Sequence, residues 1–335
     1  MTLKFLSFLY LFIINIRNWL YDKSILPTKH LSTVVVSIGN MTVGGSGKTP
    51  FTIHLAEILI NKGYSVGIIC KGYKKKMKGT IVVSDGLKIL CHVNDCGDEA
   101  YLIARKVHQS YVVADENKTK AAIFIEKQYN PDVILIDDGF QHRKLGRDID
   151  IVLYNTRIKN SKYKLLPVGL LREPIKNINR SNIVITTYDK KAELKLNNSI
   201  DKYFSKMKYD LNFFKNNKFI SVKYPKNVIA FCGIANPQIF FTHLKENGVK
   251  IKKSLSFKDH VSYSKNLIKE IENYIKKYNL TSIVTTEKDF VKLPLDFVKK
   301  TDIYILRMNV DIDNCDKLIM KIVDKVNQFK NTDKN

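Results

Sequence analysis

The stretch TVVVSIGNMTVGGSGKTP, residues 33–50, constrains this chain most, because an apolar strand pattern passes directly into a glycine-rich loop. Glycine lets the backbone turn where a Cβ would clash, so that several N–H groups can point at one anion. The helical pattern FTIHLAEILINKG, residues 51–63, follows at once and would place the positive end of its dipole at the same point. This order of strand, loop and helix predicts a nucleotide-phosphate site.

Two side chains at the end of the loop suit a bound nucleotide. We expect Lys48 to bridge the β- and γ-phosphates and the Thr49 hydroxyl to bind Mg²⁺. The strict pattern GxxxxGK[ST] is not met, since Thr42 stands where the first glycine belongs, and the alternative is a glycine-rich turn with an incidental lysine. The residues expected to bind the nucleotide are Thr42, Val43, Gly44, Gly45, Ser46, Gly47, Lys48 and Thr49.

A second element supplies carboxylates. The segment NPDVILIDD, residues 130–138, is a turn followed by a short apolar strand that ends in Asp137 and Asp138. Parallel strands deliver metal-holding acids at their carboxyl ends. We therefore expect Asp137 and Asp138 to be metal ligands, the alternative being a pair that only caps a turn.

Strand and helix patterns alternate along most of the chain. Short β-branched runs are separated by helical stretches such as DEAYLIARKVHQS, which predicts a mostly parallel sheet with helices on both faces, as in P-loop NTPases. Residues 208–226 become polar and extended, and a smaller α/β pattern without its own phosphate loop begins with VIAFCGIANP at residue 228.

The charge balance points to an anionic partner. The chain carries 56 Lys and Arg against 32 Asp and Glu, a formal net charge of +24, although a lysine-rich solvated surface is an equal alternative. No RNA-binding motif, helix-turn-helix or zinc-finger spacing is present, so nucleic acid is not the expected partner. An anionic membrane surface is favoured.

The first 22 residues predict an amphipathic helix with an unusually wide apolar face. One narrow stripe is mostly polar and recurs at three- and four-residue steps, comprising Lys4, Ser7, Leu11, Asn15, Asn18 and Asp22. Asn15 and Arg17 interrupt the apolar run, which favours a helix lying in a membrane interface over one that spans the bilayer. A helix buried in its own protein and a spanning helix or secretory signal remain as alternatives.

Seven motifs, running along nearly the whole chain from GNMTVGGSGKTP at 39–50 through DDGFQH at 137–142 to TTEKD at 285–289, resemble those of the tetraacyldisaccharide 4'-kinase family, the lipid A kinases of Gram-negative envelope synthesis. The chain departs from the family pattern at Lys71, Ala100, Leu170 and Val261. The motifs are GNMTVGGSGKTP (39–50), GDEA (97–100), DDGFQHRKLGRDIDIVL (137–153), LLPVGLLREP (165–174), FCGIANP (231–237), FKDH (257–260) and TTEKD (285–289).

The resemblance implies an activity and a location. It implies transfer of the γ-phosphate of ATP, with Mg²⁺, to the 4'-hydroxyl of a tetraacyldisaccharide 1-phosphate, which gives the 1,4'-bisphosphate lipid IVA. It also implies a peripheral or monotopic protein on the cytoplasmic face of the bacterial inner membrane. The five cysteines lack the spacing of a zinc site and agree with free thiols in a reducing compartment. The sequence gives no indication of oligomeric state.

The resemblance also implies residue roles. Asp98 is the expected general base, paired with His260, whereas the residues alone equally allow Asp98 to be a helix N-cap. Glu173 is expected to bind metal. Glu99 and Arg172 are expected to be further members of the site that bind metal or phosphate. Gln141 and His142 either line the same cleft or are needed for a tight turn.

Two other classes of function are weighed against a kinase. A nucleotide-hydrolysing switch that acts on a protein partner at the membrane would share the phosphate loop and Asp137, but no NKxD-type guanine signature is present. A basic membrane or nucleic-acid binder with a decayed site would not need Lys48 and Thr49. The predicted division is an interfacial helix at 1–22, a P-loop kinase domain at 23–207, extended linker strands at 208–226, a smaller α/β domain at 227–328 and a frayed tail at 329–335.

Overall fold

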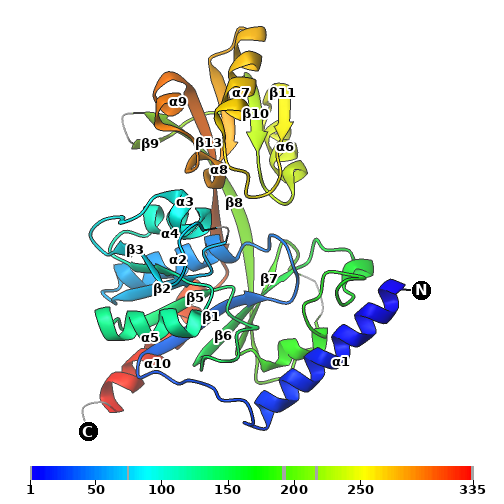
Figure 1. The fold of residues 1–335 in the computed structure, drawn as a ribbon, viewed down its shortest axis with the longest axis vertical. Coiled ribbons are helices and arrows are strands. Elements are labelled where there is room, and N and C mark those ends of the chain that lie inside the picture. Colours follow the sequence, from blue (N-terminus) through cyan, green and yellow to red (C-terminus); the bar gives the residue numbers. More distant parts are fainter. Residues whose placement is uncertain (1, 74, 191–193, 216–217, 333–335) are drawn as a thin grey trace. The chain divides into compact units, whose positions relative to one another are not determined.

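The computed structural model describes residues 2–73, 75–190, 194–215 and 218–332, which form two compact units (Figure 1). The first unit comprises residues 1–207 and 310–335, and the second comprises residues 208–309. Two long strands, β8 (Asp201–Lys215) and β13 (Asp302–Ile312), carry the chain from the first unit to the second and back. The second unit is therefore inserted into the sequence of the first.

The sheet of the first unit is parallel except at one edge. Its strand order is β8-β7-β6-β1-β5-β2-β4-β3, and only β3 runs antiparallel to its neighbour β4. The central strand β1 is buried along its whole length, as a strand covered on both faces must be. The strands are β1 (Val34–Asn40), β2 (Val66–Cys70), β3 (Ile81–Asp85), β4 (Tyr111–Ala114), β5 (Val133–Asp137), β6 (Ile149–Asn155) and β7 (Ile183–Thr187).

Helices cover both faces of this sheet, which confirms the predicted fold class (Figure 1). Right-handed crossovers require α2 (Lys48–Asn61), between β1 and β2, and α5 (Lys118–Tyr129), between β4 and β5, to lie on opposite faces, because the two connections run in opposite directions across the sheet. Side chains alternate along each strand. The core cluster under α5 accordingly contains Val35, Ile69, Val113, Ala121, Ala122, Ile125, Ile134, Ile136 and Leu145.

The remaining elements of the first unit are short or amphipathic. They are α1 (Thr2–Asp22), α3 (Val93–Cys96), α4 (Asp98–Lys106), the 3-10 turns at Asn160–Lys162 and Ile175–Arg180, and α10 (Cys315–Thr332).

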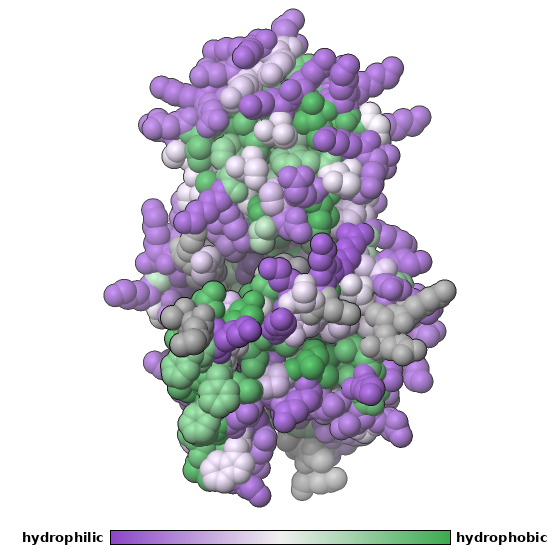
Figure 2. Space-filling view, turned by 90° about the vertical axis from the view of Figure 1, so that its right-hand side faces the viewer, coloured by the Kyte–Doolittle hydropathy of each residue, from purple (hydrophilic) through white to green (hydrophobic). Residues whose placement is uncertain are grey.

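The N-terminal helix α1 presents its apolar side outward. Three residues of the predicted polar stripe face the protein, since Ser7 and Leu11 are half-buried and Asn18 is buried, as is the apolar Ile14. The other three, Lys4, Asn15 and Asp22, are exposed. Figure 2 shows large apolar side chains gathered in the lower left part of the face onto which it looks. Among the described residues, Leu3–Asp22 is the one helix long and apolar enough to cross a membrane by length and composition. The exposed apolar residues of α1 are Leu3, Phe5, Leu6, Phe8, Leu9, Phe12, Ile13, Ile16 and Trp19.

The second unit contains parallel strands of the same continuous sheet and has two cores. Its strand order is β11-β10-β12-β13, and helices α6 and α7 follow β10 and β11 in opposite directions across the sheet, so they cover opposite faces. One core contains Phe231, Ile271 and Phe290, and the other contains Val228, Phe240 and Leu244. The elements are β9 (Lys218–Ser221), β10 (Asn227–Cys232), α6 (Pro237–Glu246), β11 (Lys250–Ser256), α7 (Lys265–Lys277), β12 (Ser282–Thr286), α8 (Glu287–Phe290) and α9 (Leu295–Lys300).

The structure divides the chain differently from the sequence patterns in two places. Helix α10 belongs to the first unit, where it contacts β1 and α2, although its residues were expected in a second domain over 227–328. The expected frayed tail at 329–335 is helical as far as Thr332, and residues 333–335 lie outside the described residues. Strands β8 and β9 pair antiparallel within the expected linker at 208–226, of which residues 216–217 are likewise not described.

Candidate active site

The glycine loop joins the carboxyl end of β1 to the first turn of α2. Gly44 and Gly47 have φ angles of 101° and 81°, in the left-handed region that glycine adopts without a steric penalty. A Cβ on Gly47 would come within 2.3 Å of Met207. Among the described residues, no side chain caps the N-terminus of α2, whose first N–H groups lack partners within the helix. This arrangement suits an anion such as phosphate.

Asn40, the last residue of β1, holds the loop in shape. Its side-chain amide donates to Ser46 Oγ at 2.8 Å, and its Oδ1 accepts from Lys48 Nζ at 3.3 Å. Lys48 also lies 3.3 Å from Ser46 Oγ. Asn40 was not among the predicted site residues, although a polar residue that ends an apolar strand pattern just before the glycine loop is a signal in the sequence that could have identified it. The structure buries it completely.

Thr49 and Asp137 meet where two parallel strands end. Thr49 Oγ1 donates to Asp137 Oδ2 at 2.8 Å, and Thr52 Oγ1 lies 3.5 Å from the other carboxylate oxygen. Burial, followed by the negative charge of Glu99, raises the pKa of Asp137 to about 6, although Lys48 and the Thr49 hydroxyl oppose the shift. A buried carboxylate that needs a cation is thus placed beside the hydroxyl that follows the phosphate-loop lysine.

Asp138 is the centre of a cluster of positive charge. Its backbone has a φ of 57°, which turns the chain sharply after β5. Arg172 Nη1 donates to both carboxylate oxygens, at 2.8 and 2.9 Å, and Lys48 Nζ lies 3.6 Å from Oδ1. Burial alone would raise the pKa of Asp138, but the charges of Lys48, Arg172 and Lys118 outweigh it and hold the pKa well below its ordinary value. Asp138 therefore stays ionised.

Lys118 is a site residue that sequence reasoning missed. It is buried at the start of α5, and its ammonium group donates to the backbone carbonyl oxygens of both Asp137 and Asp138. Burial lowers the pKa of Lys118, while the neighbouring carboxylates oppose that shift. In the sequence this lysine lies in an ordinary helical pattern, so only the packed structure reveals that its charge points inward.

Arg172 and Glu173 are tied to the loop after β5 by Gln141. Gln141 Oε1 accepts from Arg172 Nη1 at 3.3 Å, and Gln141 Nε2 donates to Glu173 Oε1 at 3.0 Å and to Asn40 O at 2.9 Å. Glu173 is completely buried, and Arg180 donates to both of its oxygens, at 2.8 and 3.2 Å. Burial would raise the pKa of Glu173, but hydrogen bonding and charge from Arg180 lower it. Gln141 therefore links the two predicted groups.

The donor set at Thr49 and Asp137 fits Mg²⁺. A hydroxyl and a carboxylate oxygen are hard ligands, and Mg²⁺ in nucleotide sites takes most of its other ligands from water and phosphate. Among the described residues no three His, Cys, Asp or Glu side chains group to hold a metal by themselves. The carboxylates of Asp138 and Glu173 are already held by guanidinium donors, so metal binding by these two residues stays a prediction.

His142 lies in the same loop as Gln141 and is electrically neutral. Its Nε2 is 3.0 Å from the Thr119 hydroxyl. Burial and the nearby charges of Lys118, Arg147 and Lys144 lower the pKa of His142 to about 4. At neutral pH this ring can therefore donate or accept a hydrogen bond but carries no charge.

Asp98 begins helix α4 and is buried. Its Oδ1 accepts the N–H of the adjacent Glu99 at 3.0 Å, and the N-cap position of α4 is held by Gly97, so Asp98 is the first residue of the helix and not its N-cap. The neighbouring Glu99 is the second cause of the raised pKa of Asp137, so the first turn of α4 lies within electrostatic range of the carboxyl end of β5. The role of Asp98 as a base stays a prediction.

His260, the predicted partner of Asp98, belongs to the second unit. It has a φ of 57° and its N–H donates to Asp259 Oδ1 at 3.0 Å. Its Nε2 lies 3.2 Å from Lys288 Nζ and 3.8 Å from Asp259 Oδ2. These contacts within the second unit orient the imidazole, and its cooperation with Asp98 stays a prediction.

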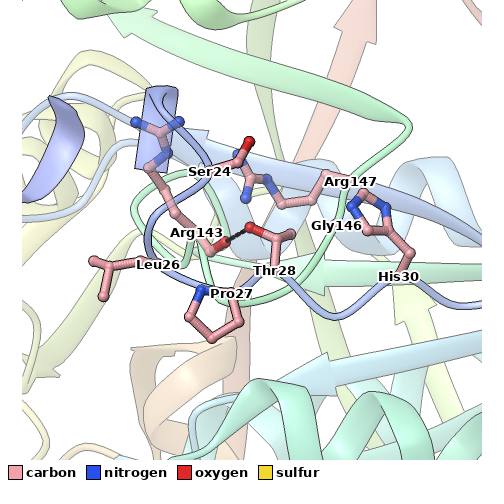
Figure 3. A pocket seen from close by; sticks show the side chains of 8 residues that line it. All are labelled: Ser24, Leu26, Pro27, Thr28, His30, Arg143, Gly146 and Arg147. Atoms are coloured by element: carbon pink, nitrogen blue, oxygen red, sulfur yellow. Dashed lines mark hydrogen bonds between the residues drawn. The ribbon is translucent and has the colours of Figure 1, made fainter. Parts of the chain in front are cut away.

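A pocket of about 370 Å³ lies in the first unit between the segment that precedes β1 and the loop that precedes β6. In Figure 3, Arg143 points from this loop toward the end of α1, and Thr28 Oγ1 donates to Arg143 O at 3.2 Å. None of the predicted site residues lines it. The lining residues are Ser24, Leu26, Pro27, Thr28, His30, Arg143, Gly146 and Arg147.

Comparison with known proteins finds similarity over almost the whole chain. A family model described as tetraacyldisaccharide-1-P 4'-kinase matches residues 1–327. A tetraacyldisaccharide 4'-kinase of Aquifex aeolicus is 38% identical over 316 residues, which cover 93% of this chain and 94% of the relative. A protein of the same name from Pelobacter propionicus is 35% identical over 303 residues, covering 86% of this chain and 81% of the relative.

A solved structure is similar in three dimensions as well. It is described as the crystal structure of an "apo" form of LpxK from Aquifex aeolicus in complex with ATP. It superposes with a TM-score of 0.79 at 35% identity, and the match covers 96% of this chain and 97% of that chain. The similarity therefore includes both units, not the phosphate-loop unit alone.

Proposed function

Because the chain belongs to the tetraacyldisaccharide-1-P 4'-kinase family, we propose that the residues around Asp137 carry out phosphoryl transfer from ATP to a lipid at a membrane surface. The protein is an ATP-dependent kinase of lipid A biosynthesis that phosphorylates the 4'-hydroxyl of a tetraacyldisaccharide 1-phosphate. The observation that carries the mechanism is the contact between Thr49 and Asp137 beside the pair of Lys48 and Asp138. A nucleotide-hydrolysing switch is not favoured.

The phosphate loop and Lys48 bind the nucleotide. The uncapped first turn of α2 supplies backbone N–H groups to the β-phosphate, and Lys48 reaches from the same turn toward the γ-phosphate. Asn40 and Ser46 hold the Lys48 ammonium group in place. When ATP binds, its phosphate oxygens compete with Asp138 for Lys48, so the ion pair keeps the lysine extended before the nucleotide arrives.

Thr49 and Asp137 would hold Mg²⁺. The bound ion would neutralise charge on the phosphate oxygens as it develops during transfer. Arg172 donates two hydrogen bonds to the Asp138 carboxylate. It adds a second positive charge beside that of Lys48, which pairs with the same carboxylate. Lys118 fixes the backbone of Asp137 and Asp138 and thereby fixes the direction of both carboxylates.

Asp98 accepts the proton of the attacking sugar hydroxyl. Phosphoryl transfer needs an in-line nucleophile and a base within hydrogen-bond reach. Asp98 is buried at the N-terminus of α4, where an ionised carboxylate is favoured by the helix dipole. His260 orients this base, as the family resemblance implies.

The lipid enters from a membrane that α1 contacts. The exposed apolar side of α1 and the net charge of +24 support a peripheral or monotopic position on an anionic surface, which we place on the cytoplasmic face of the inner membrane. In this position the lipid headgroup would meet the phosphate loop.

The decisive experiment supplies purified protein with [γ-³²P]ATP, Mg²⁺ and a tetraacyldisaccharide 1-phosphate in mixed micelles. A bisphosphorylated lipid as the labelled product is expected. Release of labelled inorganic phosphate without labelled lipid would instead support the hydrolysing switch.

A further inference from the structure

Helix α1 makes direct hydrogen bonds to the segment that carries Arg172. The Tyr10 hydroxyl donates to the carbonyl oxygen of Arg172 at 2.6 Å, and Asn18 Nδ2 donates to Glu173 Oε2 at 3.2 Å. Ser7 Oγ donates to Leu165 O at 3.2 Å, at the start of the same segment. Three side chains of one helix face thus contact residues 165–173.

The segment that α1 contacts, residues 165–173, is itself hydrogen-bonded to residues of the phosphate site. Arg172 donates to both oxygens of Asp138, and Glu173 accepts from Gln141, whose amide also donates to the carbonyl oxygen of Asn40. The backbone N–H of Arg172 donates to Met41 O at 2.9 Å, beside the glycine loop. A shift of this segment would therefore move the guanidinium group and the loop together.

A second attachment joins α1 to the loop that contains Gln141. Arg143 Nη1 donates to Asn18 O at 3.0 Å, its Nη2 contacts Asp22 at 2.7 Å, and its guanidinium lies 5.1 Å from the centre of the Tyr21 ring. Figure 3 shows this side chain extending toward the helix from the wall of the pocket. Asn18 is thus a shared point, since its side chain contacts Glu173 and its carbonyl oxygen contacts Arg143.

We infer that α1 is part of the scaffold of the active site, with Tyr10 and Asn18 as positioning residues that hold Arg172 and Glu173 in place for phosphoryl transfer. The inference rests on the proposed function. The same helix turns its apolar side outward, so one element would contact the lipid surface and brace the site. Asn18 matters most, because it is buried and donates to a completely buried carboxylate.

The loss of these hydrogen bonds should lower kcat. When a buried charged group must be held in one position for the reaction, loss of a hydrogen bond to it typically lowers the rate by about tenfold. Asn18→Ala should lower kcat about tenfold, and Tyr10→Phe, which removes one hydroxyl from a partly buried position, by about threefold. Asn18→Asp has the same shape but sets a carboxylate against Glu173, so its kcat should be lower than that of Asn18→Ala.

The test compares these variants with matched controls on the same helix. Asn15→Ala removes an exposed asparagine, and Tyr21→Phe removes a hydroxyl while keeping the ring that lies beside Arg143. For each protein we would measure kcat and KM for the lipid and for MgATP in mixed micelles, binding to vesicles of one part anionic lipid to three parts zwitterionic lipid, and the melting temperature. A positioning role lowers kcat at saturating substrates with vesicle binding equal to wild type, whereas the controls keep wild-type kcat.

A double mutant tests whether Asn18 acts through Arg172. Residues that act as one unit show non-additive effects, so Asn18→Ala combined with Arg172→Ala should be no slower than Arg172→Ala alone. Losses that multiply would overturn the inference, as would wild-type kcat in both Asn18→Ala and Tyr10→Phe, or a loss fully explained by weaker vesicle binding.

A readout that does not require lipid turnover separates this inference from the proposed function. Amide hydrogen exchange of residues 165–174 should become faster in Asn18→Ala and Tyr10→Phe than in wild type and the two controls. Equal exchange in all five proteins would overturn the scaffold role even if the wild type is an active kinase. An inactive wild type with faster exchange in the two variants would instead overturn the proposed function and leave the attachment of α1 established.

Discussion

The hydroxyl of Thr49 donates a hydrogen bond to the carboxylate of Asp137 across 2.8 Å, which joins the first turn of α2 to the carboxyl end of β5. The register of the sheet makes this contact possible, because Ile38 of β1 is paired with Asp137 of β5 and the glycine loop starts soon after that pair. The Asp137 side chain, which would hold Mg²⁺, is here surrounded by protein. Four predictions concern this site and its surroundings.

Replacing Asp137 should make the metal-free protein more stable and inactive. The pKa of Asp137 is raised to about 6 in the folded protein, so the folded state binds this proton more tightly than the unfolded chain does. The stabilising effect of the bound proton is complete below the unfolded pKa near ~3.9 and is lost as the pH rises through about 6. Asp137→Asn should therefore stabilise the metal-free protein at pH 8 by up to about 3 kcal/mol, and hardly at all at pH 4.

Chemical denaturation in EDTA at both pH values measures this effect. The matched control is Asp85→Asn, because backbone N–H groups of Lys88 and Leu87 lower the pKa of Asp85, which gives the opposite sign. If Asp137→Asn were less stable than wild type at pH 8, burial of the Asp137 carboxylate would not be destabilising the folded protein, and the prediction would be wrong.

Removing either member of the pair of Lys48 and Asp138 should abolish lipid phosphorylation without unfolding the protein. Lys48→Ala deletes the cation that faces the phosphates, and Asp138→Ala releases Lys48 and Arg172 from their shared anchor. Product formation below 1% of wild type is expected for both variants, an order-of-magnitude value for loss of electrostatic stabilisation (~10²-fold or more). Circular dichroism should match that of wild type, and a well-folded Lys48→Ala protein with normal activity would remove this loop from the kinase site.

The base should be detectable by its effect on kcat. Loss of a positioned general base typically costs about 10² to 10⁴ in rate, so Asp98→Ala should lower kcat into this range with little change in ATP affinity. His260→Ala should lower kcat by less, because the histidine orients the base and does not accept the substrate proton. The double mutant should be no slower than Asp98→Ala alone.

Steady-state kinetics at saturating lipid, with ATP binding measured separately, distinguishes the possible results. If the losses multiply in the double mutant, the two residues have separate roles. A His260→Ala enzyme with wild-type kcat would take the second unit out of the chemistry.

Deleting residues 1–21 should release the protein from membranes only in part. The apolar side of α1 is lost, but each basic side chain near an anionic surface still contributes on the order of 1 kcal/mol. High salt should then release the remainder. Phe8→Glu, on the exposed side of α1, is the gentler variant, because it leaves the contacts of Asn18 and Tyr10 intact. Flotation of vesicles at low and high salt reports the result, and a truncated protein that stays bound at high salt would identify another apolar surface as the main anchor.

The contact between Thr49 and Asp137 was predictable because it depends on local rules. Glycines permit the loop, and the carboxyl ends of parallel strands meet at one edge of a sheet, which brings Thr49 to Asp137. The family fold followed from the same alternation of strands and helices. The pairing of Asp138 with Arg172 could not be foreseen, since it depends on a long excursion between β6 and β7 whose path no periodicity encodes.

Other parts depend on packing that a linear pattern does not contain. Lys118 has the sequence context of an exposed helical lysine, and only the placement of α5 turns its ammonium group toward two backbone carbonyls. The amphipathic pattern of α10 predicts a helix with one buried side, but not that Leu318 and Ile322 pack in the first unit. Asn18 was placed correctly in the polar stripe of α1, yet its partner lies 155 residues away and leaves no local signal.

The return of the chain through β13 to α10 has a consequence for synthesis on the ribosome. Residues 310–335, which complete the first unit, emerge only after the whole of residues 208–309. At typical elongation rates this delay is on the order of ten seconds, so the inserted unit has time to fold while the earlier one still lacks a helix against β1 and α2. For this chain, folding during translation would therefore finish the internal unit before the one that contains the nucleotide loop.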